Sequence, residues 1–138
     1  TSNPGAGDLQ DQVVDDQPLY RHLAMLLAPL VASRDGKQGS SSLGIVAGAT
    51  WPEEAQDLRA TLPSAPFLIP GFGAQGAGPE RATSGLIRGQ HGWEGGLVNS
   101  TRGLIFPETA ERAGSFAEWQ NAIAATIEQN KTILNSVF

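Results

Sequence analysis

The stretch FLIPGFGAQGAG, residues 67–78, carries the clearest strand-and-loop signal in the chain. Its first residues, Phe67 to Ile69, are an apolar run of the kind that is buried on both faces of a parallel sheet. From Gly71 to Gly78, four of the eight residues are glycine. Glycines at the carboxyl end of a strand let backbone N–H groups approach an anion closely. The stretch therefore predicts a ligand site at the sheet edge where parallel-sheet enzymes bind their ligands.

Strand and helix signals alternate on both sides of this stretch. The same patterns predict two further strands, at 43–49 and 96–98, and four helices, at about 18–31, 51–62, 79–86 and 116–134. Strands roughly 25 residues apart with one helix between them indicate βα units of a parallel sheet. With a strand end at 1–5 the chain has four such units, and its 138 residues are close to half of the roughly 250 of a (β/α)8 barrel.

Two predicted helix starts have the spacing of a capping box, Thr50 with Glu53 and Ser115 with Glu118. Apolar side chains at helical spacing predict which residues are buried. Trp119 lies on the apolar stripe of the last helix and is predicted to be in the core. The stripe of the first helix consists of Leu19, Leu23, Leu26, Leu27 and Leu30.

A second strand end supplies a cation. The strand at 96–98 is followed by NSTRG, residues 99–103, and the fork of donors on Arg102 can grip a phosphate dianion. In barrels of this type the phosphate site commonly lies between the loops after strands seven and eight. The glycines at 71, 73 and 76 also match the dinucleotide pattern G-x-G-x-x-G, but the acidic residue that such a fold needs at the next strand end is absent.

Composition excludes several other classes of protein. A net charge of −5 and scattered basic residues argue against nucleic acid as a partner. The longest apolar helical stretch is too short for a bilayer, so no membrane partner is expected. With no cysteine and only His22 and His91, neither a disulfide framework nor a metal site is predicted, and a cytoplasmic location is the default. The acidic residues between Asp8 and Asp16 are interpreted as a solvated surface.

Three segments together resemble orotidine 5'-monophosphate decarboxylase of the longer bacterial type: TSNPG at 1–5, PGFGAQG at 70–76 and NSTRG at 99–103. GATWPE at 48–53 is similar to the family's sixth strand end and the helix after it, so the resemblance covers nearly the whole chain. It implies an α/β fold, the C-terminal half (about strands 5–8 with their helices) of a (β/α)8 TIM barrel. Residues 1–138 would be the C-terminal part of a single barrel domain whose N-terminal part is missing.

Residue by residue, the resemblance implies a substrate site. Gln75 would bridge the phosphate and the pyrimidine of orotidine 5'-phosphate, and Ser2 would hydrogen-bond the pyrimidine amide and Gln75. Pro70 would pack near the ring and Arg102 would bind the phosphate. The rest of the phosphate loop would be Gly73, Gly76, Thr101 and Gly103.

The resemblance also implies an activity. The family converts orotidine 5'-phosphate to uridine 5'-phosphate in pyrimidine biosynthesis, without metal or cofactor, by means of a lysine among aspartates at the ends of strands 2 and 3. No position of this chain matches that motif, so no catalytic residue is assigned here and the chain alone is expected to be inactive. Its expected partners are the substrate, the N-terminal half of the barrel and, in a homodimer, a second copy. A non-catalytic phosphate-binding half barrel and another phosphosugar enzyme on this fold are the alternatives, which fold alone does not separate.

Overall fold

The structure, a computed structural model, describes residues 4–73 and 76–138 of the chain. Its centre is a parallel sheet of three strands in the order β3 (Ile45–Val46), β4 (Phe67–Pro70) and β7 (Gly96–Asn99). Each strand lies beside the next one in this series, and a helix connects them, as predicted for consecutive βα units of a barrel.

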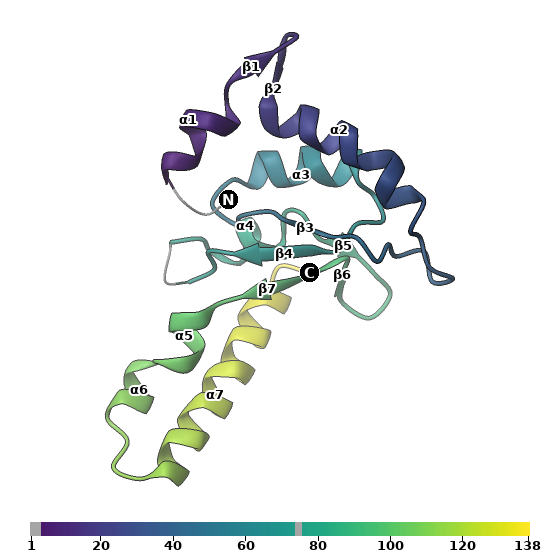
Figure 1. Ribbon diagram of the computed structural model, residues 1–138. Helices are drawn as coiled ribbons and strands as arrows, with labels where there is room; N and C mark the ends of the chain where they lie inside the picture. The colour runs from purple at the N-terminus through teal and green to yellow at the C-terminus, as the bar shows by residue number, and fades with distance from the viewer. Residues whose placement is uncertain (1–3, 74–75) are drawn as a thin grey trace.

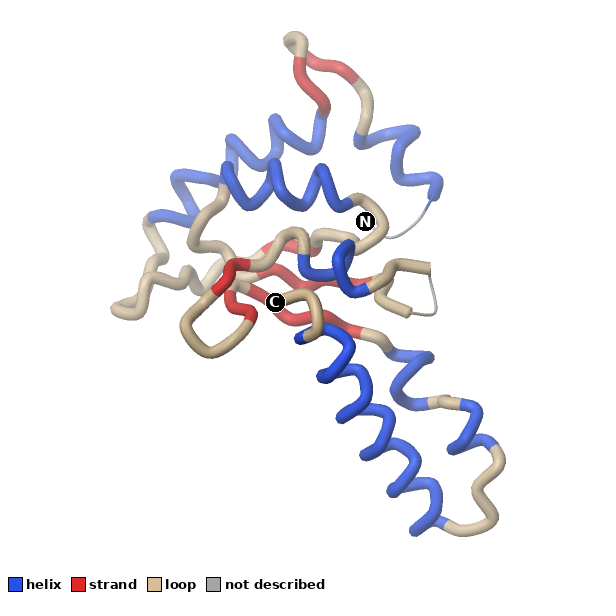
Figure 2. The backbone as a smooth tube through the Cα atoms, turned by 180° about the vertical axis from the view of Figure 1, so that it is seen from behind, coloured by secondary structure: helices blue, strands red, loops and turns tan. Residues whose placement is uncertain are grey.

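The longer helices fall into two groups. Helices α2 (Leu19–Ala32) and α3 (Pro52–Thr61) lie over one side of the sheet (Figure 1). Helices α5 (Thr101–Ile105), α6 (Glu108–Glu111) and α7 (Phe116–Asn135) form an arm that extends away from the sheet beyond β7, and Ile133 and Leu134 near the end of α7 pack against the core. Figure 2 shows the same separation from behind.

Shorter elements complete the described fold. Helix α4 (Pro79–Thr83) follows the glycine loop, and two hairpins join β1 to β2 and β5 to β6. The remaining bounds are η1 (Pro4–Ala6), α1 (Gly7–Gln10), β1 (Val13–Val14), β2 (Gln17–Pro18), β5 (Ile87–Arg88) and β6 (Trp93–Glu94).

The core lies between the sheet and the two helices α2 and α3. Phe67 and Ile69 of β4 are each 1% exposed, whereas Leu68 between them is 42% exposed. This alternation follows from the period of two in a strand, which places neighbouring side chains on opposite faces. Val31 of α2 and Leu62 just after α3 close the core from the helix side.

The β5–β6 hairpin, which the sequence did not predict, anchors the end of the chain. Trp93 Nε1 donates a hydrogen bond to the carbonyl of Leu134 at 3.1 Å, and the Trp93 ring meets Phe138 edge to face with centroids 5.4 Å apart. Arg88 donates to the carbonyl of Val137 at 3.2 Å. These contacts hold the carboxyl end of α7 against the hairpin.

The predicted helices and the three predicted strands from 43 to 98 are present, with shorter bounds at some ends. Of the strand end predicted at 1–5, Pro4 and Gly5 lie in the 3-10 helix η1, and residues 1–3 lie outside the described residues. Only Ile45 and Val46 of the predicted strand at 43–49 form a ladder. Helix α2 begins at Leu19, so Pro18 precedes the helix and does not lie in its first turn. The capping box at Ser115 is confirmed, because the Ser115 hydroxyl accepts a hydrogen bond from the Glu118 N–H at 3.2 Å.

The capping box predicted at Thr50 is wrong. Helix α3 begins one residue later than a Thr50 cap requires, with Trp51 at the N-cap and no side-chain hydrogen bond there. Thr50 Oγ1 is buried and has no hydrogen-bond partner within the described residues. The spacing of Thr50 and Glu53 is right for a cap, but the hydroxyl of Thr50 is buried, and the helix begins only at Pro52.

The predicted burial of the helix stripes is also wrong in part. Leu23, Leu26 and Leu30 of α2 are 46%, 74% and 43% exposed, and Trp119 of α7 is 37% exposed and stacks on Phe116. Among its 20 residues α7 has none that is buried. Helical spacing identifies an apolar face, but no described residue of this chain covers the exposed side chains named here.

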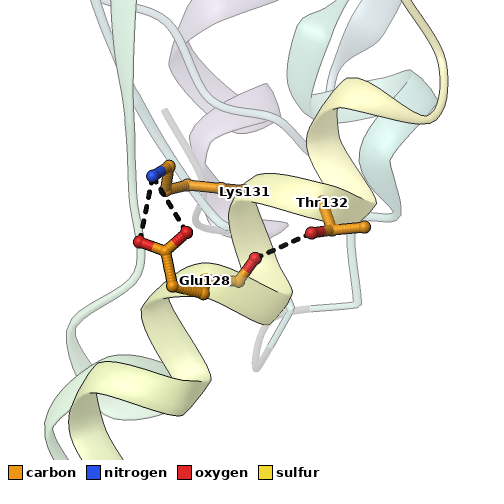
Figure 3. A network of polar contacts seen from close by, with 3 residues as sticks. All are labelled: Glu128, Lys131 and Thr132. Carbon is orange, nitrogen blue, oxygen red and sulfur yellow. Dashed lines mark hydrogen bonds and ion pairs between the residues drawn. The ribbon is translucent and has the colours of Figure 1, made fainter.

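The polar contacts around Glu128 on α7 are local to the helix. Lys131 bonds both carboxylate oxygens of Glu128, at 2.9 and 3.0 Å, and the Thr132 hydroxyl donates to the Glu128 carbonyl at 3.0 Å (Figure 3). Exposed pairs three residues apart on a helix contribute only a few tenths of a kcal/mol. They stabilise the helix itself and fix no contact with the sheet.

Arg59, near the end of α3, connects several segments of the backbone. Its guanidinium lies over the Phe67 ring, 3.8 Å from the centroid, and burial lowers the pKa of the group. The side chain donates hydrogen bonds to five backbone carbonyls, those of Gly85 (2.9 Å), Leu62 (3.2 Å), Pro63 (3.0 Å), Ala65 (2.8 Å) and Gly95 (2.7 Å). No carboxylate within the described residues pairs with it, so the positive charge lies among carbonyl dipoles and against the face of the Phe67 ring.

We predict that Arg59→Ala destabilises the fold by about 3 kcal/mol or more, because hydrogen bonds to a charged group are worth about 1.5–3 kcal/mol each. Of the five carbonyls, only those of Leu62 and Gly95 would keep another donor within the described residues. Arg59→Lys should lose most of the same stability, since an ammonium cannot span the five acceptors. Urea unfolding of the wild type and both variants measures this. Arg112→Ala, which removes only the exposed pair with Glu108, is the matched control and should change stability by less than about 0.5 kcal/mol.

Candidate functional site

The carboxyl ends of β4 and β7 form the two walls of a cleft of about 200 Å³. The parallel register pairs Pro70 with Asn99, which brings the two strand ends to the same edge of the sheet. The residues that line the cleft are Pro70, Gly71, Phe72, Asn99, Ser100, Thr101 and Arg102. The structure thus brings together Pro70, Thr101 and Arg102, which the sequence analysis assigned to one site.

The loop after β4 depends on glycine. Gly71, Gly73 and Gly76 have φ angles of 107°, 71° and 87°, a region that disfavours residues with a side chain. The Gly73 N–H donates to the carbonyl of Ala77 at 3.0 Å, and the Gly76 N–H donates to that of Gly73 at 2.8 Å. These bonds make a tight turn beside the cleft, where the sequence analysis placed Gly73 and Gly76.

Arg102 provides the charge of the site. It lies in the first turn of α5, its side chain is exposed, and it makes no ion pair or side-chain hydrogen bond within the described residues. The lining contains no carboxylate, so the cleft has one positive charge and no negative one. This balance suits an anion, and the guanidinium is available to bind it.

Two polar residues of the cleft were missed by the sequence analysis. Ser100 donates a hydrogen bond from Oγ to the carbonyl of Phe72 at 3.2 Å, which joins the two walls. Asn99 Oδ1 is buried and has no hydrogen-bond partner in the described part of the chain. Their position between the strand and Arg102 was visible in the sequence, but the contact across the cleft was not.

Other predicted residues lie elsewhere or outside the described part. Ser2 and Gln75, the two residues assigned to the pyrimidine, lie outside the described residues, so their predicted roles remain predictions. The acidic residues Asp8, Asp11, Asp15 and Asp16 are exposed, as the sequence analysis predicted.

His22 contacts the carbonyl of Val14, and His91 is exposed. The described residues contain no group of three His, Cys, Asp or Glu side chains arranged to hold a metal ion. In the same residues, no helix is both long and apolar enough to cross a membrane.

The fold is part of a parallel α/β barrel, and the cleft lies at the carboxyl ends of its strands with one arginine among the described lining residues. Comparison with known proteins narrows this class. No family model matches the chain. Among curated proteins, it is 38% identical over 137 residues to orotidine 5'-phosphate decarboxylase of Rhodopirellula baltica, covering 96% of this chain and 44% of that protein. The corresponding enzyme of Halorubrum lacusprofundi is 40% identical over 139 residues, covering 98% and 48%.

Solved structures agree with these relatives. The structure of Leishmania donovani UMP synthase matches with a TM-score of 0.63 and 31% identity, over 97% of this chain and 26% of that one. Leishmania donovani OMP decarboxylase matches with a TM-score of 0.58 and 29% identity, over 91% and 44%. The chain spans about half the length of the curated relatives, 44% and 48% for the two above. By sequence and by fold it is related to the orotidine 5'-phosphate decarboxylases and corresponds to their C-terminal half.

The glycine loop gives a prediction with an internal control. Gly76 and Gly39 both have positive φ (87° and 76°), and a Cβ built on either meets no atom within 4 Å. Alanine at each position should therefore cost a similar backbone strain of about 1 kcal/mol. Only Gly76→Ala should also weaken binding of a ribonucleoside 5'-monophosphate, by about fivefold or more, because only its loop borders the cleft. Thermal unfolding and titration calorimetry measure the two effects, and equal affinity of both variants would contradict the assignment of the loop.

Proposed function

We propose that this chain supplies the phosphate- and pyrimidine-binding part of an orotidine 5'-phosphate decarboxylase, which converts orotidine 5'-phosphate to uridine 5'-phosphate. The observation that supports this most is the cleft between β4 and β7. Arg102 has no ion pair with the described residues, none of the described lining residues is a carboxylate, and a glycine turn lies alongside. Relatives named for this activity match nearly the whole chain.

In the proposal, the residues of the cleft bind the substrate, and the residues that act on its carboxylate come from the N-terminal half of the enzyme. Arg102 and the loop residues Gly73, Gly76, Thr101 and Gly103 hold the phosphate, while Pro70 packs near the ring. Gln75 and Ser2, which lie outside the described residues, bond the pyrimidine. The lysine and aspartates that act on the carboxylate come from the N-terminal half, and no cofactor takes part.

The sheet supports an N-terminal half as a partner. Val46, Leu68 and Leu97 lie side by side in register on one face, and they are 57%, 42% and 73% exposed. Both outer strands of the sheet, β3 and β7, have an edge without a strand partner in the described residues. A parallel sheet is normally covered on both faces, and a closed barrel has no edges, so a second half barrel would satisfy both needs. A cytoplasmic location, which rests on the composition of the chain, and a homodimer, which rests on the family resemblance, complete the proposal.

The first prediction from this proposal is that the pure 138-residue chain does not release CO₂ from orotidine 5'-phosphate. This chain would bind the phosphate of the substrate, but the lysine and aspartates that act on the substrate carboxylate would belong to the other half. Adding a separately expressed N-terminal half should restore turnover, which loss of the substrate's ultraviolet absorbance measures. Turnover by the chain alone would contradict the assignment of the catalytic groups to the other half.

The second prediction concerns Arg102 in the complete enzyme. Arg102→Ala should lower kcat/KM for orotidine 5'-phosphate about 30-fold or more, because losing one partner of a charged hydrogen-bonded pair costs about 2 kcal/mol or more. The nucleoside orotidine, which lacks the phosphate, serves as the control substrate and should react at nearly the same rate with both proteins. Equal losses on the two substrates would show that Arg102 supports the fold and does not bind the phosphate.

A further inference from the structure

Ser100 stands at the N-cap of α5 but does not cap the helix. Serine at this position usually accepts a hydrogen bond from an N–H of the first turn. Here the Ser100 side chain makes no such bond, and its Oγ donates instead to the carbonyl of Phe72, at 3.2 Å, in the neighbouring loop. The hydroxyl therefore serves a contact between segments 28 residues apart in the chain.

This contact fixes the two walls of the cleft relative to each other. The strand ladder between β4 and β7 ends at Pro70 and Asn99. Beyond it, the bond from Ser100 to Phe72 is the one hydrogen bond that joins residues 71–73 and 76–78 to residues 100–103. The Phe72 side chain is 7% exposed, so the ring anchors the loop in the core while Ser100 holds its carbonyl.

Because Gly103 has no side chain, it leaves room for this hydroxyl. A Cβ built on Gly103 would lie 2.8 Å from Ser100 Oγ but 4.0 Å from Ser100 Cβ. Gly103 does not have a positive φ, so its backbone conformation alone does not require glycine. The space next to Arg102 is therefore kept open for the Ser100 hydroxyl.

We propose that Ser100 is a positioning residue of the phosphate site, which acts through the Phe72 carbonyl and is accommodated by Gly103. The inference rests on the proposed function. The Ser100 hydroxyl holds the glycine-loop wall at a fixed separation from the wall that carries Arg102. It also covers a carbonyl oxygen whose partial negative charge would otherwise stand unpaired beside a bound dianion.

The test compares four variants of the complete enzyme, Ser100→Ala, Ser100→Thr, Gly103→Ala and the double variant Ser100→Ala with Gly103→Ala. Dissociation constants for uridine 5'-phosphate and the split between KM and kcat are measured for each. Ser100→Ala should weaken binding and raise KM about fivefold, the effect of one hydrogen bond, with little change in kcat. Ser100→Thr, which keeps the hydroxyl, should restore most of the affinity.

The glycine variants separate this role from a general structural one. Gly103→Ala should weaken binding as much as Ser100→Ala, since its methyl group displaces the hydroxyl. In the double variant it should add nothing, because the Oγ that it would meet is gone. Ser136→Ala, which removes a hydroxyl that donates to the Ile133 carbonyl at 2.7 Å far along the chain, is the matched control and should leave affinity unchanged.

The outcomes separate the proposed role of Ser100 from the proposed function of the enzyme. If wild-type enzyme binds uridine 5'-phosphate and Ser100→Ala binds it equally well, the role of Ser100 is overturned and the proposed function stands. Additive losses for Ser100→Ala and Gly103→Ala would also overturn it, because the two changes would then act through different contacts. If the wild-type enzyme does not bind uridine 5'-phosphate at all, the proposed function and the role of Ser100 fall together.

Discussion

The guanidinium of Arg59 holds the amino ends of the strands and the end of α3 in one place. Of its five carbonyl partners, Ala65 precedes β4 and Gly95 precedes β7, and the Phe67 N–H also donates to Gly95, at 2.9 Å. The Ala65 carbonyl has no other donor within the described residues, whereas that of Gly95 is shared between Arg59 and the Phe67 N–H. One side chain with a planar fork of donors thus ties together the segments that lead into β4 and β7.

The Arg59 contacts and the proposed binding site are consequently located at opposite ends of the sheet. At the amino ends, the partly buried guanidinium of Arg59 donates to backbone carbonyls and lies over the Phe67 ring. At the carboxyl ends, Arg102 has no partner within the described residues, and the turn at Gly73 and Gly76 has positive φ angles. Barrels commonly show this division, because the loops after the strands vary for function while the other end maintains the fold. Beyond the ends of the strands, the hydrogen bond from Ser100 to Phe72 joins the two segments that line the cleft.

The exposed apolar surfaces follow from the half-barrel architecture. Leu26 of α2 is 74% exposed, Leu97 of β7 is 73% exposed, and α7 has no buried residue among its 20. Separate apolar faces of this kind are unusual on a complete domain, because each would normally be covered by a neighbouring layer. The relatives, about twice as long, have additional sequence that could provide such a layer.

The sequence by itself determined the three strands of the sheet, the glycine loop, the position of Arg102 and the Ser115 cap, because each depends on residues close together in the chain. The tertiary structure alone decided the Arg59 contacts, the bond from Ser100 to Phe72 and the anchoring of α7 by Trp93. It also overrode the predicted cap at Thr50 and the predicted burial of Trp119. The spacing of residues in the sequence indicates which face of a helix or strand is apolar and which turns are favoured. Which residues cover that face, and which group a hydroxyl bonds, is fixed only when distant segments pack together.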